Sequence, residues 1–168
     1  MNRLIATDKN NWTALIARLA IGITILPHGA QKLLGWFGGY GFNDTMGFLT
    51  TGVGLPFILA LLVILIEFFG SLFLIFGFLT RISAFGMIAL FTGVVFTSHI
   101  NNGFFMNWGM EAGKGEGLEY FILLFGLVVI SLIAGGGKAS IDAAISKAKI
   151  IVRSYKRKHP YINSQNVN

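Results

Sequence analysis

The sequence predicts an all-α membrane protein, a polytopic four-helix bundle with both termini in the cytoplasm. Three observations predict this class: an apolar composition, four long apolar runs and a one-sided distribution of basic residues. The 168-residue chain is 54% hydrophobic and 12% charged, against about 25% charged residues in a typical soluble domain. A soluble chain of this size could not bury so much apolar surface, and the composition therefore excludes that class.

Four apolar stretches approach the length of about 20 residues that a helix needs to cross a bilayer. We expect spans at residues 12–35, 55–79, 82–99 and 118–134, within a membrane domain of residues 1–142. Lipid offers no partner for an unpaired backbone polar group, so helices are the expected form of these spans. A cleaved signal peptide fits the first run poorly, because Arg18 interrupts it and no small-residue cleavage site follows.

The basic residues lie almost entirely on one side of this predicted topology. With a cytoplasmic N-terminus, the outer loops hold only Lys114. The inner side holds Arg3, Lys9, Arg81, Lys138, Lys147, Lys149, Arg153, Lys156, Arg157 and Lys158. Cytoplasmic segments of membrane proteins carry such an excess, and we expect a multi-pass protein of a bacterial inner membrane with both termini inside. The net charge of +6 then reflects topology and lipid contact, and nucleic acid is not an expected partner.

The connectors between the spans differ in length and character. The link LTRIS at residues 79–83 permits only a tight helical hairpin. In the first outer loop, residues 35–54, we expect a short interfacial helix that bears Met46, Phe48 and Leu49, capped by Asn43 or Asp44. The second outer segment, residues 101–117, is polar, aromatic and glycine-rich. Such loops either close over a site or merely connect the spans.

The basic tail, residues 143–168, follows the membrane domain. Its first part alternates apolar and basic residues, which is typical of an amphipathic helix lying on an anionic inner leaflet. A solvated tail that only sets the topology is the alternative. Residues beyond Pro160 are expected to be disordered.

Glu67 is the residue that the apolar runs do not explain, because it places a carboxylate in the middle of LLVILIEFFGSLFLIFG. An unpaired charge at that depth costs about 3 kcal/mol or more. Gly70 and Ser71 share its helix face, and small residues mark the places where membrane helices approach one another. We therefore expect Glu67 to face a neighbouring helix and to be either protonated or paired with a cation.

The first span offers that cation on a face of small residues. Arg18, Gly22, Gly29 and Lys32 fall within an arc of about 80° on an ideal helix. Arg18 lies about 9 Å and Glu67 about 18 Å from the cytoplasmic ends of their helices, so we expect these two to form an ion pair. The pair could serve function, or it could only fix the register of the two helices.

Polar residues near the outer ends of the spans form a candidate ligand site. They are His28, Gln31, Lys32, His99 and Glu119, with Glu67 at the floor. His28 is the expected proton-exchanging group of this cluster. His99 could instead be a solvated interfacial histidine, and Lys32 could simply reach outward to the interface. No metal site is predicted, and two histidines are weak support for haem.

Four segments in sequence order resemble the DoxX family of small bacterial and archaeal membrane proteins. The segments are ARLAIGITILPHGAQKLLG, IEFFGSLFLIFGFLTRISA, GEGLEYFILL and GGGKASID, which together cover about residues 12–142. The resemblance implies a four-helix membrane protein linked to oxidoreductase systems, since the family is named for a small subunit associated with a terminal quinol oxidase and with thiosulfate:quinone oxidoreduction. The motif positions that carry over are Arg18, Gln31, Lys32, Glu67, Arg81 and Glu119.

Two functions from different classes remain open. The first is a small subunit of a membrane oxidoreductase complex that offers a quinone-type pocket or a docking surface, with no covalently bound cofactor. A quinone needs an apolar slot and one or two hydrogen-bonding partners, which His28, Lys32 and Glu67 could supply. The alternative is a small proton-coupled transporter, or a membrane scaffold whose basic tail recruits a partner. A homo-oligomer is compatible with either. The absence of Cys excludes a thiol relay.

Overall fold

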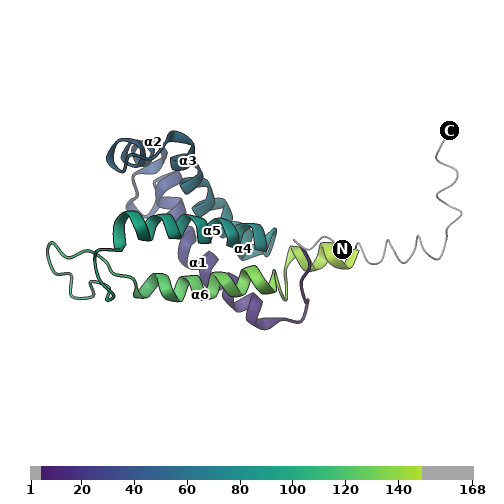
Figure 1. Ribbon diagram of the computed structural model, residues 1–168. Helices are drawn as coiled ribbons and strands as arrows, with labels where there is room; N and C mark the ends of the chain where they lie inside the picture. The colour runs from purple at the N-terminus through teal and green to yellow at the C-terminus, as the bar shows by residue number, and fades with distance from the viewer. Residues whose placement is uncertain (1–4, 149–168) are drawn as a thin grey trace, which may run out of the picture.

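The computed structural model describes residues 5–148, and this part of the chain is helical without any strand (Figure 1). In chain order the elements are α1 (Trp12–Leu34), η1 (Trp36–Gly38), α2 (Gly41–Gly47), η2 (Phe48–Gly52), α3 (Phe57–Leu65), η3 (Ile66–Gly70), α4 (Ser71–Phe76), α5 (Thr80–Val94), η4 (Val95–His99) and α6 (Glu119–Ala134). Residues 141–148 form a further helix. The segments η2, η3 and η4 are π-helical, and η1 is a 3₁₀ turn.

Three helices are long and apolar enough to cross a membrane. They are α1, the continuous helix α3–η3–α4 over Phe57–Phe76, and the continuous helix α5–η4 over Thr80–His99. The fourth apolar helix, α6, has 16 residues and rises about 24 Å, which is less than the hydrocarbon core of about 30 Å. The all-helical class is therefore confirmed for residues 5–148, with candidate spans at three of the four expected places, and the fourth place holds a shorter helix.

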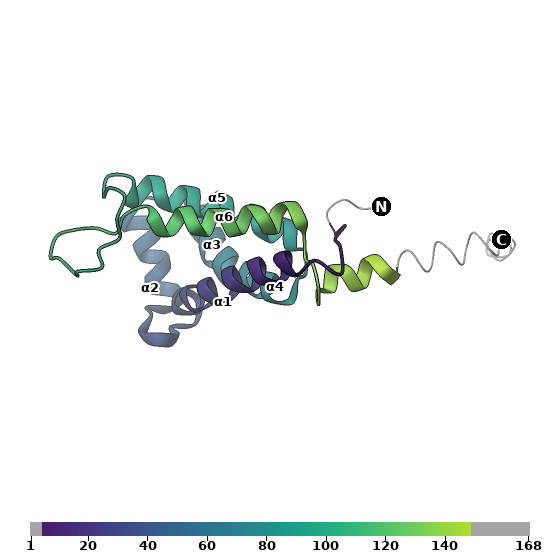
Figure 2. The same cartoon turned by 90° about the horizontal axis from the view of Figure 1, so that it is seen from below.

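The helices run back and forth along one axis, so that the connections gather at two ends of the bundle (Figures 1 and 2). We call one the terminal end, which comprises residues 5–11, 77–81 and 135–148. The other is the loop end, which comprises residues 34–56 and 99–119. The first and last described segments meet at the terminal end, where the Ser146 hydroxyl donates to the Ile5 carbonyl at 3.3 Å.

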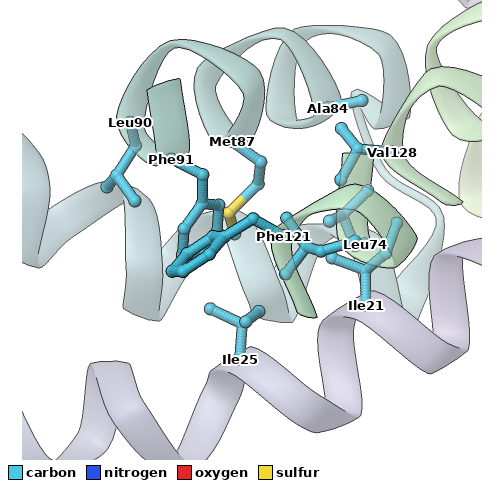
Figure 3. Close-up of a cluster of buried hydrophobic side chains, with 10 residues drawn as sticks. Ile21, Ile25, Leu74, Ala84, Met87, Leu90, Phe91, Phe121 and Val128 are labelled. Carbon is cyan, nitrogen blue, oxygen red and sulfur yellow. The ribbon is translucent and has the colours of Figure 1, made fainter. Parts of the chain in front are cut away.

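The main apolar core lies between α1, α4, α5 and α6. Ile21 and Ile25 of α1 point toward Met87 and Phe91 of α5 and toward Phe121 of α6 (Figure 3). The rest of this buried cluster consists of Leu74, Ala84, Leu90, Leu124 and Val128. Residues from all three candidate spans and from α6 thus share one core, which places α6 inside the bundle.

Glycines bring α1 into backbone contact with the second span, as the small-residue face predicts. A Cβ at Gly22 would lie 2.9 Å from the Ser71 carbonyl oxygen, and one at Gly29 would lie 2.6 Å from the Phe68 backbone nitrogen. Side chains at these positions would force the helices apart. The two glycines therefore set the distance between α1 and the helix that carries Glu67.

The turn between α4 and α5 is as short as the sequence predicts. Gly77 ends α4 in the left-handed conformation with φ 64°, and Leu79 begins the next helix with φ 47°. A Cβ at Gly77 would lie 2.4 Å from the Ser140 Cβ, so only glycine fits against the segment that follows α6. The hairpin is thus packed directly against the end of the membrane domain.

The first outer loop contains the expected helix, but its start differs from the prediction. α2 begins at Gly41 with Tyr40 as the N-cap and no capping side chain, so Asn43 and Asp44 lie inside the helix. Capping by either residue was wrong, because the left-handed Gly41 (φ 75°) already turns the chain into the helix. Met46 and Leu49 are buried against α3, whereas Phe48 is exposed.

The C-terminal tail is described only in part. Residues 141–148 are helical, and the Ser140 hydroxyl accepts the Ala143 amide at 3.1 Å as its cap. The expected basic amphipathic helix begins at Ala143, so its first residues lie in this helix. The rest of that helix and the predicted disorder after Pro160 fall on residues 149–168, outside the described residues, and the predicted anionic-lipid contact stays a prediction.

Candidate functional site

The centre of the candidate site is an ion pair between α1 and the second span. The Lys32 ammonium donates to Oε2 of Glu67. The Glu67 side chain is only 4% exposed, whereas that of Lys32 is 31% exposed. The carboxylate therefore faces the bundle interior and pairs with a cation of the first helix. This arrangement avoids the free-energy cost of an unpaired charge in lipid.

Arg18 is not the partner of Glu67, which corrects the pairing expected from the sequence. The expectation assumed that the predicted cytoplasmic ends of the two helices lie at the same level. In the structure Arg18 lies level with the end of α4, because its Nη1 donates to the Leu74 carbonyl at 2.9 Å. Gly29, eleven residues further along α1, lies against the Glu67 and Phe68 backbone. α1 thus extends beyond α4 at the terminal end, and this offset brings Lys32 to Glu67.

Three local features hold Glu67 in place. Glu67 lies in η3, a π-helical turn, and such turns insert one extra residue and often occur at functional sites. The close approach at Gly29, one turn before Lys32, lets the lysine side chain reach across the helix contact. The Ser71 hydroxyl donates to the Glu67 carbonyl, which occupies a backbone acceptor next to the extra residue. The pair is therefore built into the helix packing.

A cavity of about 560 Å³ opens beside the ion pair at the loop end. Its lining residues come from the end of α1 and from the first outer loop: Gln31, Lys32, Gly38, Gly39, Tyr40, Asp44, Thr45 and Phe48. The Gln31 amide donates to the Phe37 carbonyl at 3.3 Å, which ties the loop back to α1. We call this hollow the polar cavity after Lys32 and Asp44 in its wall, although most of its accessible wall is apolar. It gives a ligand access to Lys32, the partly exposed member of the ion pair.

Tyr120 is a site residue that the sequence reasoning missed. It is half-buried at the start of α6 and lies close enough to Glu67 for the two groups to interact electrostatically. Its ring packs edge-on against Phe121 at a centroid distance of 5.4 Å. A tyrosine at an interfacial helix end was read as part of an aromatic belt, and that reading hid its inward position.

The structure does not bring His28 into the polar cavity. His28 is exposed on α1 and is not among the residues that line the cavity. Neither a hydrogen bond nor a ring contact joins His28 to His99 in the described part of the chain. The two histidines that suggested a shared pocket therefore belong to separate surroundings.

His99 and Glu119 instead hold the second outer segment. His99 Nδ1 is 2.8 Å from the Glu116 carbonyl oxygen, and its ring packs on Phe121 at 4.6 Å. The Glu119 carboxylate accepts the Met106 amide at 3.1 Å and the Trp108 indole N–H. Both side chains have satisfied partners in the loop, which gives them a structural task at the loop end.

Arg18 is fully occupied by backbone carbonyls at the terminal end. Its Nε donates to the Gly136 carbonyl at 2.7 Å and Nη2 donates to that of Ala139 at 2.8 Å. Further bonds go to the carbonyls of Leu74, Ile75 and Lys138. A guanidinium has five N–H donors, and here five carbonyls surround it. We call this arrangement the arginine cage.

Asp142 completes the terminal end beside the arginine cage. Its carboxylate accepts the Leu79 amide at 3.0 Å and the Thr80 amide at 2.9 Å, the first amides of α5. Arg81, a carried-over motif position, donates from Nη2 to the Ala6 carbonyl at 3.1 Å. The motif residues at this end therefore join residues 5–11 and 135–142 to the α4–α5 turn, away from the polar cavity.

The chemistry available at the site is that of a lysine–carboxylate pair beside a cavity. Within residues 5–148, no group of three or more His, Cys, Asp or Glu side chains could hold a metal ion. The pair can donate hydrogen bonds from Lys32, carry a proton on Glu67, and accept or stabilise a polar head group. Fold and site together define a multi-pass helical membrane protein with a lysine–carboxylate pair between two helices, beside the loop of residues 35–54.

Comparison with known proteins assigns the family. The DoxX family model matches residues 13–100, and the chain therefore belongs to the DoxX family, as the four resembling segments indicated. It is also 33% identical over 140 residues to the inner membrane protein YqjF of Escherichia coli (strain K12), an alignment that covers 79% of this chain and 92% of that protein. No solved structure matches the chain significantly.

Proposed function

We propose that the chain is a small protein of a bacterial inner membrane, that α6 crosses the membrane together with the three longer helices, and that both termini are cytoplasmic. The meeting of the first and last described segments at the terminal end supports an even number of crossings. Lys9, Arg81 and Lys138 at that end follow the positive-inside rule. Local thinning of the bilayer accommodates a helix as short as α6.

The function that the site supports best is binding of a quinone-type ligand at the polar cavity, as a small subunit of a membrane oxidoreductase. The observation that carries this is the Lys32–Glu67 pair, because the Glu67 side chain is buried while Lys32 is partly exposed and lines the cavity. Lys32 would donate a hydrogen bond to a quinone carbonyl, and Glu67 would supply or receive the proton that accompanies its reduction. The electron carrier would belong to the partner oxidoreductase.

A proton-coupled transporter is the second candidate, and the same ion pair favours it. Ionisable residues inside membrane helices often form proton relays, and a paired acid and base with one exposed member has the required access. Tyr120, within electrostatic reach of Glu67, would extend such a relay toward α6. Binding of a quinone analogue distinguishes the two candidates, because a transporter of another solute has no reason to bind one.

The test is binding of a tail-less quinone analogue to the purified chain in lipid nanodiscs. The double variant Lys32→Gln/Glu67→Gln keeps hydrogen-bonding groups of similar size but removes both charges, which avoids leaving one buried charge unpaired. We expect it to bind at least about tenfold more weakly, because a hydrogen bond to a charged group contributes about 1.5–3 kcal/mol.

His28→Ala is the matched control, since His28 is a titratable residue of the same helix outside the cavity. It should bind as the wild type does. No binding by the wild type, or equal binding by the double variant, would contradict the quinone-site proposal and leave the transporter as the better candidate. Copurification of an oxidoreductase with the tagged chain in mild detergent tests the partner.

A further inference from the structure

A second hollow, an apolar groove of about 340 Å³, lies next to the polar cavity. One wall comes from η2, α3 and the connector between them, and the other comes from α5 and η4. Its lining is aliphatic or aromatic except for Gly93, Thr97 and Ser98. The Thr97 hydroxyl donates to the Gly93 carbonyl at 2.9 Å and also lies 3.2 Å from the Ser98 hydroxyl. No charged side chain lines the groove, in contrast to Lys32 and Asp44 in the polar cavity.

Phe48 connects the two hollows. It lines both the polar cavity and the apolar groove, and its side chain is 65% exposed. Two residues near Phe48 in the sequence line one hollow each: Thr45 lines the polar cavity and Leu49 lines the groove. A molecule with its polar end at Lys32 therefore meets an apolar surface directly beyond Phe48.

We propose that the groove receives the hydrocarbon tail of the same ligand whose polar head binds at Lys32, so that the substrate class is a long-tailed amphiphile such as an isoprenoid quinone. This inference rests on the proposed head-group site. The groove follows α5 from Ala89 to Ser98, a rise of about 14 Å, which suits a chain lying along the helix and not a compact ring.

The tail contributes affinity by packing and not by leaving water. Lipid tails are as apolar as the side chains of the groove, so transfer from bilayer to protein gains little hydrophobic free energy. A fixed groove gains many close contacts, each of about 0.1–0.2 kcal/mol. The tail should therefore add a moderate preference that depends on the groove being open, and filling the groove should remove that preference alone.

Gly93 is the position at which the groove can be filled without disturbing the fold. A Cβ at Gly93 would have no atom within 4 Å, and the residue lies inside α5 on the groove wall. Gly126 in α6 is its matched control, because it is also an exposed helical glycine with no atom within 4 Å of a Cβ, and it lines neither the polar cavity nor the apolar groove. Gly93→Leu and Gly126→Leu thus add the same side chain to equivalent backbones.

The experiment compares a decyl-tailed quinone with its tail-less analogue in nanodiscs, with affinities expressed per mole fraction in the membrane. For the wild type and for Gly126→Leu, we expect the decyl form to bind about tenfold more tightly, which corresponds to 1.4 kcal/mol. For Gly93→Leu, we expect the two forms to bind equally, with the affinity for the tail-less analogue unchanged.

Each other outcome overturns the inference and names a different explanation. Equal binding of both analogues by the wild type would mean that the groove holds no tail, while the head-group site stands. A tail preference that survives Gly93→Leu would place the tail elsewhere. A dimer of the wild type that Gly93→Leu dissociates, without any tail preference, would assign the groove to a second copy of the chain. Failure of both analogues to bind refutes the proposed function itself.

Discussion

Arg18 and Lys32, the two basic side chains of α1, are held by different kinds of partner. Arg18, near the terminal end, is 1% exposed and donates to five backbone carbonyls. Lys32, near the loop end, has a single carboxylate partner and remains 31% exposed beside the polar cavity. A planar guanidinium suits a fixed cage of acceptors, whereas a flexible ammonium suits a partner that can change. The terminal end is thus fixed by its hydrogen bonds, and the loop end keeps groups available for a ligand.

The comparison shows that one helix can carry both a charged residue that stabilises the fold and a charged residue that is accessible to a ligand. Both residues are motif positions of the family resemblance, and both lie on the small-residue face of α1. Only the surroundings distinguish them. Backbone carbonyls surround Arg18 and leave no space for a ligand, whereas Lys32 lies beside the polar cavity. Burial of a charged residue in a membrane helix is therefore not by itself evidence of a binding site.

Removal of Arg18 should have the largest effect on stability. Arg18→Met removes a donor from five carbonyls, of which that of Leu74 still accepts the Gly77 amide at 3.2 Å. Each acceptor left buried and unsatisfied costs about 1–3 kcal/mol, so we expect the free energy of unfolding to fall by about 3 kcal/mol or more. Denaturant unfolding in detergent measures it. Lys9→Met, an exposed cation at the same end, should be nearly neutral. Equal stability of the two variants would show that the cage is not what fixes the terminal end.

Gly29→Ala should have an intermediate effect, and it tests the loop end. The added Cβ would lie 2.6 Å from the Phe68 nitrogen, so the helices must separate at a cost of about 1–3 kcal/mol. Gly126→Ala, with open space at its Cβ, should instead stabilise α6 by about 0.5–1 kcal/mol. Thermal unfolding of both variants measures the contrast. A Gly29→Ala protein as stable as wild type would mean that the Lys32–Glu67 pair does not depend on this close contact.

Glu119→Gln should have the smallest effect, confined to the second outer segment. The variant weakens the bonds to the Met106 amide and the Trp108 indole, and we expect a global loss of no more than about 1 kcal/mol. Hydrogen exchange at the Met106 amide should become faster. Glu111→Gln, which affects only an exposed pair with Lys114 at 3.3 Å, is the control. A large fall in global stability would show that this loop is part of the core.

Much of the fold could be predicted from the sequence, because the bilayer restricts what an apolar run can do. The helical class, the α4–α5 hairpin and the close contact at Gly22 and Gly29 follow from run length and small-residue spacing. The π-helical turns could not be predicted, because one inserted residue shifts the helical phase without a signal in the composition. The start of α2 was missed because the left-handed Gly41 replaced a capping side chain.

The candidate site could be predicted only where the free-energy cost of an unpaired charge in lipid determines where a side chain lies. Glu67 was expected to face a neighbouring helix, either protonated or paired with a cation. The choice of Lys32 over Arg18 depended on the offset of two helices, which a single sequence does not contain. The arginine cage was missed for another reason. Backbone carbonyls can be supplied by any residue, so the partners of Arg18 carry no side-chain signature apart from the glycines that let them approach.

The arginine cage also imposes an order on assembly. Arg18 leaves the ribosome early, yet its bonds at Gly136, Lys138 and Ala139 span 118 to 121 residues of sequence. Until the last of these residues has been synthesised, the charge in the first helix has no complete set of acceptors. A chain truncated before residue 136 keeps the Leu74 and Ile75 carbonyls but lacks the other three acceptors of Arg18. Synthesis as far as Ala139 is thus the step that completes the hydrogen bonds of the charge in the first membrane helix.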